Sequence, residues 1–579
     1  MEDFLNTFNK ILNAVNGVIW HNSVLYIVLG VGLLFTIWSG FCQYRALTHG
    51  VQVTRGEYDD KNDPGAINHF QALSAALSAT VGLGNIAGVA LAIMLGGPGA
   101  VFWMWMVGFV GMALKTTEVT LSMIYRNTDD SDNPHGGPMF VASHGMAKMG
   151  FPRLGKFIGG IFVVTLLIST VTGGNMFQAW NVADITHQYF GVPQIVVGIF
   201  LAVVVGAVIL GGIKRIGAVA GRLVPFMCTM YLLAALYVIG IKFGHIPDML
   251  RLIVTEAFNP SEAQGAFLGG TVGYALLWGM KRALFSSESG QGSSPIAHSA
   301  AKTDEPVREG VVAGIEPFID TIVVCTLTSL VILSTGVWNR GPDVKFLQPP
   351  QVVAQGDSWT LAETPIEAEE SPDLHEGSDV FTVVQAQRND NTGLNLHRFD
   401  GKIHVEGKGE AAEYSIKWSK SDTAKGELEV IKEGAFYDYK GATLTAKAFD
   451  SVTPGLGKWL VSLAAWLFAV STMISWSYYG EQGVVYLLGN KLVIPYKLLY
   501  CMLIIVASVP QLIASDAQLD NLTALGTGVM LWSNIPIMLI FSVVAMKAYH
   551  SYFRRLKAGE FHPHKAPLIT DVIEGKDVE

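Results

Sequence analysis

The stretch that decides the fold is Thr80-Val81-Gly82-Leu83-Gly84-Asn85-Ile86-Ala87-Gly88-Val89, which places three glycines and an asparagine inside an otherwise apolar segment. Irregular backbone at membrane depth is tolerated only where protein or a water-filled cavity surrounds it. The amide and carbonyl groups freed there become ligands for an ion or a charged solute. We therefore predict a membrane helix that breaks at a transporter binding site.

Composition agrees with a membrane protein. Of the 579 residues, 50% are hydrophobic and 15% are charged, with a mean hydropathy of +0.38. This is more apolar surface than one soluble core requires, so we expect a polytopic membrane protein. The four cysteines, Cys42, Cys228, Cys325 and Cys501, lie in or beside apolar segments and indicate packing, not a disulfide framework or a metal cluster. No phosphate loop or catalytic-triad spacing stands out, so we expect no enzyme, cofactor, nucleic-acid partner, obligate protein partner or ATP-driven pump.

The apolar segments define a topology. Runs of about 20 residues, enough to cross ~30 Å of hydrocarbon, recur about eleven times. They lie near 21–42, 69–94, 98–125, 157–182, 193–211, 217–242, 266–284, 310–337, 456–478, 493–514 and 521–547. Basic residues gather in alternate connections, among them Arg45, Lys148, Lys214, Arg282 and Arg554. By the positive-inside rule these connections are cytoplasmic, so we expect the N-terminus outside and the C-terminus in the cytoplasm.

One segment differs in kind from the rest. Polar alternation in Gly401-Lys402-Ile403-His404-Val405-Glu406-Gly407 and in Thr443-Leu444-Thr445-Ala446-Lys447 predicts short strands with glycine turns. Residues 340–450 contain 20 acidic and 12 basic residues, a balance of −8 against −9 for the whole chain. We therefore predict an acidic, extracytoplasmic β-rich insert. The expected parts are an N-terminal segment with an extra transmembrane helix (1–67), core helices one to seven (68–337), the insert (338–455), core helices eight to ten (456–548) and a cytoplasmic tail (549–579).

A second glycine-rich stretch follows five predicted helices after the first. Gly269-Gly270-Thr271-Val272-Gly273-Tyr274 shares Thr-Val-Gly with the first stretch and occupies the equivalent helix of a five-plus-five inverted repeat. Glycines of this kind also permit close helix packing, which is the alternative explanation. Because polar Asn85 and Thr271 lie beside the glycines, we predict that both helices unwind there.

Further motifs extend the first stretch: Gly84-Asn85-Ile86-Ala87-Gly88-Val89-Ala90, Gly96-Gly97-Pro98-Gly99-Ala100-Val101-Phe102-Trp103-Met104-Trp105 and Gly136-Gly137-Pro138-Met139. Together with Gly174-Asn175-Met176-Phe177-Gln178 and Phe285-Ser286-Ser287-Glu288-Ser289-Gly290, they resemble the sodium:alanine (alanine or glycine:cation) symporters. The resemblance covers nearly all of the membrane part but not the insert. It implies an all-α, LeuT-like fold of five plus five inverted helices with one extra N-terminal helix. It also implies sodium-driven import of a small neutral amino acid, alanine or glycine, across a bacterial inner membrane.

The predicted substrate site meets both charges of an amino acid with backbone dipoles. Amides from Gly82 to Asn85 lie at a helix N-terminus and would bind the carboxylate, whereas carbonyls near Ala79 and Gly270 would face the ammonium group or sodium. Phe177 would limit the size of the side chain. The expected substrate-binding residues are Thr80, Gly82, Gly84, Asn85, Phe177, Gly270, Thr271, Gly273, Thr472 and Trp476. Ser287, Ser289, Gln291 and Ser294 depart from the usual family pattern, so the exact amino acid stays open.

Sodium prefers hard oxygen ligands, which hydroxyls and carbonyls provide. The resemblance places Ser471 and Thr472 on the eighth core helix, opposite the carbonyls of Ala79 and Gly82, so these four residues form the expected sodium site. The alternative for the two hydroxyls is bonding back to their own helix. We expect no other metal and no cofactor besides sodium as the coupling ion.

Charged residues inside the apolar segments predict further roles. Glu316 and Asp320 are one turn apart and form a candidate gate or relay, with a structural hydrogen bond as the alternative. Lys115 and Glu118 are three residues apart on one predicted helix, and we expect them to pair locally.

The alternative function is an amino-acid sensor or receptor whose insert binds the ligand. The glycine breaks favour transport, because a pure membrane anchor does not need them.

Overall fold

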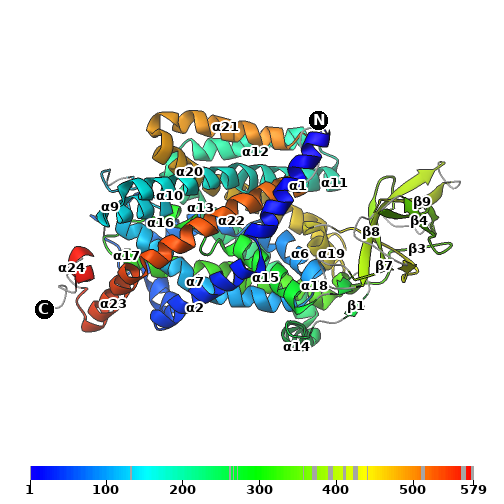
Figure 1. The fold of residues 1–579 in the computed structure, drawn as a ribbon, viewed down its shortest axis with the longest axis horizontal. Helices are drawn as coiled ribbons and strands as arrows, with labels where there is room; N and C mark the ends of the chain where they lie inside the picture. Colours follow the sequence, from blue (N-terminus) through cyan, green and yellow to red (C-terminus); the bar gives the residue numbers. More distant parts are fainter. Residues whose placement is uncertain are drawn as a thin grey trace.

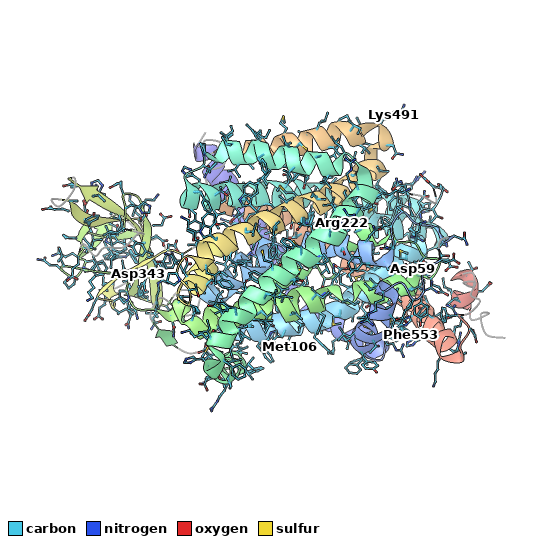
Figure 2. The ribbon with its side chains drawn as sticks, turned by 180° about the vertical axis from the view of Figure 1, so that it is seen from behind. Asp59, Met106, Arg222, Asp343, Lys491 and Phe553 are labelled. Carbon is cyan, nitrogen blue, oxygen red and sulfur yellow. The ribbon has the colours of Figure 1, made fainter. Side chains whose placement is uncertain are left out.

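The computed structural model describes residues 2–60, 62–130, 133–259, 262–264, 267–269, 271–355, 358–367, 374–388, 395–407, 412–420, 428–439, 441–509, 516–561 and 569–574. Helices form one large bundle, and most strands lie beyond one end of it (Figure 1). Figure 2 shows Asp343, in the strand region, at the opposite end of the molecule from Asp59 and Phe553.

The helices of the bundle follow one another along the chain with short interruptions. They are α1 (Glu2–Ile19), α2 (Asn22–Trp38), α3 (Cys42–Arg45), α4 (Val51–Thr54), α5 (His69–Thr80), α6 (Ala87–Gly96), α7 (Gly99–Tyr125), α8 (Pro138–Phe140), α9 (Met146–Lys148), α10 (Pro152–Val171), α11 (Phe177–Phe190), α12 (Gln194–Ile209), α13 (Gly212–Ile241), α14 (Ile246–Glu256), α15 (Val272–Ser287), α16 (Ser294–His298), α17 (Pro306–Ala313), α18 (Thr326–Thr335), α19 (Ala442–Asp450), α20 (Leu456–Leu488), α21 (Val493–Ala507), α22 (Asp516–Ile540), α23 (Ser542–Ala558) and α24 (Ile569–Glu574). Two π-helical segments matter for the site, η4 (Thr172–Met176) and η6 (Phe318–Cys325).

Eight helices among the described residues are long and apolar enough to cross a membrane, and the bent pair of α5 with the segment Leu83–Gly96 makes nine. This confirms a mostly helical, polytopic membrane protein. The sequence predicts about eleven spans by the ~30 Å criterion. The two remaining predicted spans correspond to α12 and α15, which have 16 residues each and are shorter than the about 20 residues that cross ~30 Å of hydrocarbon.

The first helix break lies where the sequence predicts it. α5 begins with a capping box between Asn68 and Gln71 and ends at Thr80. A 3-10 turn, Leu83–Asn85, follows, and the chain then resumes as α6 with a bend of 61°. The break leaves backbone groups inside the bundle without helical partners, which is the condition for a buried binding site.

The second break is not at Gly269–Tyr274, and that expectation was wrong. Residues Phe267–Gly269 form β2, which pairs with β1 (Glu262–Gln264), and α15 begins directly after Thr271, whose side chain caps it. The chain breaks instead at the other end of α15, where Glu288, Gly290 and Gly292 adopt positive φ. The shared Thr-Val-Gly marks a helix start here, because a threonine hydroxyl is a good N-cap acceptor.

The strands between 344 and 437 form a seven-stranded sheet in the order β3-β11-β7-β8-β9-β6, with β10 paired to β7, and a separate pair β4-β5. Their bounds are β3 (Val344–Lys345), β4 (Val352–Gln355), β5 (Ser358–Leu361), β6 (Thr364–Pro365), β7 (Asp379–Gln385), β8 (Leu396–Glu406), β9 (Glu413–Trp418), β10 (Glu429–Val430) and β11 (Gly434–Tyr437). The stretch 401–407 overlaps β8 as predicted, but 443–447 lies in α19. Its alternating residues pack as a helix because Leu444 and Ala448, one turn apart, are both buried.

Candidate functional site

Asn85 links the break to two other segments. It is fully buried, and its Oδ1 accepts the backbone N–H of Gly82 at 2.8 Å. Its Nδ2 donates to Asp320 Oδ1 at 2.5 Å and to Ser286 Oγ at 3.0 Å. Ser286 Oγ donates in turn to Asp320 Oδ2 at 2.9 Å. The cluster therefore ties the first break to the C-terminal end of α15 and to η6, and it places Asp320 in a structural hydrogen-bond network at the break.

Sequence reasoning missed Ser286 and the neighbouring Phe285 as site residues. A Cβ built on Gly84 would lie 3.5 Å from the Phe285 ring, so the second break adjoins the first. Thr271 and Gly273 are at the far end of α15, about 18–22 Å from Phe285 and Ser286 at 1.5 Å per residue. Gly270 lies outside the described residues. The sequence feature that could have identified Phe285 and Ser286 is the polar run that follows Phe285 at the end of an apolar segment.

Thr472 on α20 faces the break. Its hydroxyl is buried and has no hydrogen-bond partner among the residues that the structure describes. A Cβ built on Gly82 would lie 2.9 Å from Thr472 Oγ1, so this hydroxyl touches the irregular backbone. An orphaned buried oxygen next to freed backbone groups fits a hard cation, because the ion would supply the missing partner.

Ser471, the neighbouring residue on α20, is hydrogen-bonded to α5. Its Oγ donates to the carbonyl of Phe468 at 2.9 Å and lies 3.2 Å from the carbonyl of Ser78, whereas Ser78 Oγ donates to the carbonyl of Ser471 at 2.7 Å. These bonds clamp α5 to α20 one turn before the break. Ala79 is also buried between the two helices. Ser471 therefore bonds both to its own helix and to α5, whereas the Thr472 hydroxyl bonds to neither among the described residues.

The predicted aromatic residues lie on α20 and α11. Trp476 is buried, packs on Gly174 in η4, and has its ring 5.3 Å from that of Tyr479. Phe177 begins α11 and lines a cavity together with Gly84. Thr80 is buried at the end of α5, where its hydroxyl lies 3.4 Å from the carbonyl oxygens of its own helix.

The cavity beside Phe177 has a volume of about 510 Å³ and separates the bundle from the strands. Its bundle wall comes from α6, α11 and α15, and its other wall comes from β7, β8 and the residues before α19. Gly84 places the cavity directly at the first break. The cavity therefore extends from the first break to the strand region.

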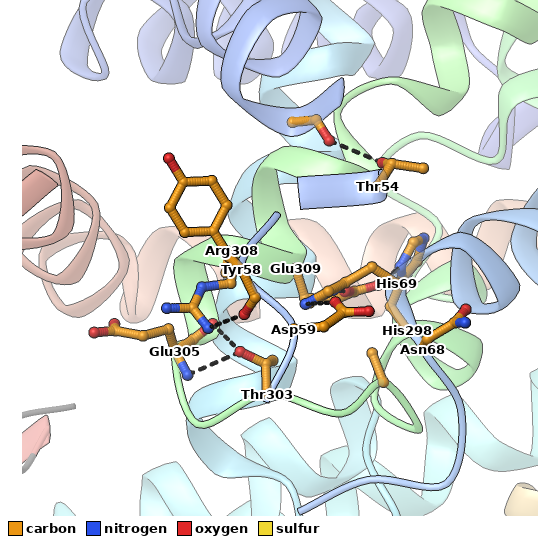
Figure 3. A network of polar contacts seen from close by, with 12 residues as sticks. Thr54, Tyr58, Asp59, Asn68, His69, His298, Thr303, Glu305, Arg308 and Glu309 are labelled. Atoms are coloured by element: carbon orange, nitrogen blue, oxygen red, sulfur yellow. Dashed lines mark hydrogen bonds and ion pairs between the residues drawn. The ribbon is translucent and has the colours of Figure 1, made fainter. Parts of the chain in front are cut away.

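A second polar network includes Glu309, His69 and His298, which Figure 3 shows from close by. Glu309 contacts both His69 and His298, and His298 Nε2 lies 2.5 Å from Glu316 Oε1. Lys115 Nζ lies 3.2 Å from Glu316 Oε2. All five side chains are buried, so the network joins α5, α7, α16 and α17 through groups that need one another as partners.

The expected local pair on α7 is present, and the network gives each member a further partner. Lys115 Nζ is 4.0 Å from Glu118 Oε1 and 3.2 Å from Glu316, so its closer partner comes from another segment. Glu118 also accepts a bond from Asn534 Nδ2 at 2.8 Å. Sequence spacing identifies neighbours on one helix only, and cannot rank them against a partner from across the bundle.

An arginine clamp lies beside this network. Arg126 donates to the carbonyls of Ser299 and Ala301, each at 2.8 Å, and to that of Thr303 at 2.5 Å. In the adjoining loop, burial and the neighbouring Asp304 raise the pKa of the Asp63 carboxyl. The loop that follows α16 is therefore held to the end of α7.

Residues 5–355 and 428–566 match the sodium:alanine symporter family. The chain belongs to that family. A sodium/alanine symporter of Methanococcus maripaludis is 35% identical over 493 residues, covering 85% of this chain and 86% of the relative. An uncharacterized transporter of Haemophilus influenzae is 30% identical, covering 96% and 98%.

Two further similarities are more limited. An amino-acid carrier protein of Bacillus subtilis is 35% identical over 60% of this chain and 71% of its own length. A solved manganese transporter of Eremococcus coleocola superposes with a TM-score of 0.45 at 13% identity, over 84% of this chain and 83% of its own. At that TM-score the similarity carries no information about substrate or mechanism. The family is one of sodium and amino-acid symporters with transmembrane helices, and its match leaves out residues 356–427.

Proposed function

We propose that this protein is a sodium-coupled symporter that imports a small neutral amino acid, alanine or glycine, by alternating access. The observation that carries the proposal is the unpartnered Thr472 hydroxyl against Gly82 at the helix break. Family membership supports both the coupling ion and the substrate class.

Sodium would be held by the Thr472 hydroxyl and by carbonyls at Ala79 and Gly82, with Ser471 as the fourth member of the site. The amides from Gly82 to Asn85 would bind the substrate carboxylate, since the N-terminus of α6 carries a partial positive charge. Phe177 and Trp476 would close the pocket around the side chain, and Thr80 would line it. The sodium ion and the substrate carboxylate would both be bound without a charged side chain, which suits a low-dielectric site.

The proposed fold is LeuT-like. Its two inverted halves would place one broken helix at α5–α6 and the other at α15–α16, and the contact between Asn85 and Ser286 joins these two breaks. The strand region between 338 and 455 would be the extracytoplasmic insert of a bacterial inner-membrane protein, and the C-terminus would be cytoplasmic. The network around Glu316 would then lie at the cytoplasmic end and act as a gate, while Asp320 would hold the broken helices together.

Uptake of radiolabelled alanine into proteoliposomes tests this proposal. An inward sodium gradient should drive accumulation that a potassium gradient does not, and unlabelled glycine should compete. Lack of accumulation in vesicles with correctly oriented protein would refute symport of these amino acids. Labelled alanine that binds without being transported would then favour the sensor.

A further inference from the structure

The cavity between the bundle and the strands contains charges of both signs. Its bundle end is formed by Gly84 and Phe177, and its strand wall includes Asp379, Arg398 and Asp400. The volume of about 510 Å³ lies within the range typical of small-molecule sites. A ligand on its way to the helix break would pass this charged wall.

The wall is a regular part of the sheet. β7 and β8 pair in antiparallel register, with Val383 opposite Arg398 and Phe381 opposite Asp400. Side chains alternate between the two faces of a strand, so Arg398 and Asp400 share one face. Phe399, between them, points to the other side and is buried. The charges therefore stand on a backbone that the pairing of β7 and β8 keeps in place.

Arg398 is oriented by several neighbours. Its Nε donates to Asp400 Oδ1 at 2.5 Å, its Nη2 pairs with Asp438 at 2.6 Å, and its guanidinium carbon lies 4.1 Å from the centre of the Phe381 ring. Burial alone would lower the pKa of Arg398, but Asp438 and Asp400 raise it above its ordinary value. The guanidinium is fixed next to a carboxylate, Asp400, whose side chain is 60% exposed.

A second arginine lies on the opposite wall. Arg282 belongs to α15, is 7% exposed, and lies with its guanidinium carbon 5.5 Å from the Trp278 ring and 5.8 Å from the Phe285 ring. The sequence assigned Arg282 to a cytoplasmic connection, whereas the structure places it in α15 on this cavity. A buried charge is costly unless polar or charged groups meet it.

The strand region is also tied to the break itself. Thr445 in α19 donates its hydroxyl hydrogen to the carbonyl of Ile86 at 3.2 Å. A Cβ built on Gly441 would lie 3.2 Å from Ala87, so the residue before α19 touches the start of α6. The wall of the cavity and the helix break are therefore directly connected.

We propose that this cavity is an outer binding site for the transported α-amino acid, in which Arg398 and Arg282 bind the carboxylate and Asp400 and Asp379 bind the ammonium group. The inference rests on the proposed function and adds a second substrate position before the break. Two arginines would repel a cation and weaken a site for cations alone. A zwitterion can pair its carboxylate with the arginines and its ammonium group with the aspartates. β8 lies within the residues 356–427 that the family match leaves out, so Arg398 and Asp400 are not part of the matched family pattern.

Two charge-removing substitutions test the proposal in full-length protein in proteoliposomes. Arg398→Gln and Asp400→Asn should each raise the external alanine concentration for half-maximal uptake by about tenfold, because each loses a charged hydrogen bond. The sodium concentration for half-maximal uptake should stay the same. Lys417→Gln on β9, whose side chain is 53% exposed and is not among the residues that line the cavity, is the matched control and should behave like the wild type.

A binding measurement separates this site from the central one. Labelled alanine should bind to purified wild-type protein in potassium buffer, and Asp400→Asn should remove that binding. Asp400 is the safer variant if Arg398→Gln fails to fold, since Arg398 also bridges to Asp438.

Each outcome decides the question. Unchanged alanine dependence in both variants would overturn the outer site. Tighter apparent binding in Arg398→Gln together with weaker binding in Asp400→Asn would show a cation-attracting wall and overturn zwitterion recognition. If the wild type takes up no alanine with sodium, the proposed function itself fails and this inference falls with it. Wild-type uptake with no response in the variants refutes the outer site alone.

Discussion

Thr472→Val should separate sodium affinity from stability. Valine matches threonine in shape, and the hydroxyl that it removes has no partner among the described residues. Folding therefore loses no hydrogen bond, and the free energy of unfolding should stay the same or rise by about 1 kcal/mol, because a buried unsatisfied group is removed. An interaction of a polar group with a charge contributes about 1.5–3 kcal/mol, so the sodium concentration for half-maximal uptake should rise by about 10- to 150-fold.

The assay is alanine uptake into proteoliposomes across a sodium series, combined with thermal unfolding of the purified variant. Thr472→Ser keeps the hydroxyl and should retain most of the sodium affinity. Thr527→Val is the matched control, because the Thr527 hydroxyl is buried but donates to the carbonyl of Thr523 at 2.9 Å. It should cost some stability and leave sodium dependence unchanged. An unaltered sodium requirement in Thr472→Val, or a loss of stability larger than in Thr527→Val, would refute the reasoning.

Three further substitutions test other parts of the molecule. Phe177→Ala should admit larger neutral amino acids, seen as stronger competition by unlabelled leucine against alanine, and unchanged selectivity would contradict its role as a wall. In the wild type, the Lys115 ammonium lies 3.2 Å from the Glu316 carboxylate. Glu316→Gln removes this negative charge and should destabilise the protein by about 3–5 kcal/mol in thermal unfolding. Adding Lys115→Met should restore much of the loss, and an unstable double variant would argue against the pair. Gly82→Ala places a Cβ 2.9 Å from Thr472 Oγ1 and should lower sodium-driven uptake by about tenfold, whereas wild-type uptake would show that the contact is not part of the site.

The first break illustrates what one local stretch can establish. Three glycines and an asparagine between Thr80 and Val89 have no use in a straight apolar helix, and the 61° bend lies there. Local composition suffices because a bilayer leaves few other ways to accommodate such residues. Membrane character and the family follow from the sequence for the same reason, since hydropathy and contiguous motifs need no knowledge of distant contacts.

The second break shows where local reasoning fails. Thr271-Val272-Gly273 resembles the first stretch but begins a helix, whereas the break lies after Ser287. Likewise, 443–447 alternates like a strand but folds as α19, because neighbouring helices bury one of its faces. A short pattern fits both periodicities, and only the surrounding surfaces select one.

The sequence by itself therefore determined a polytopic membrane protein, its family and the position of one helix break, since each is encoded by adjacent residues. Tertiary structure alone decided which groups meet: Asn85 with Asp320, Lys115 with Glu316, and the charged face of β8 with the cavity at Gly84. These partners are far apart along the chain. Their pairing depends on how the helices and strands pack, because buried polar groups must find partners wherever packing brings donors and acceptors within reach.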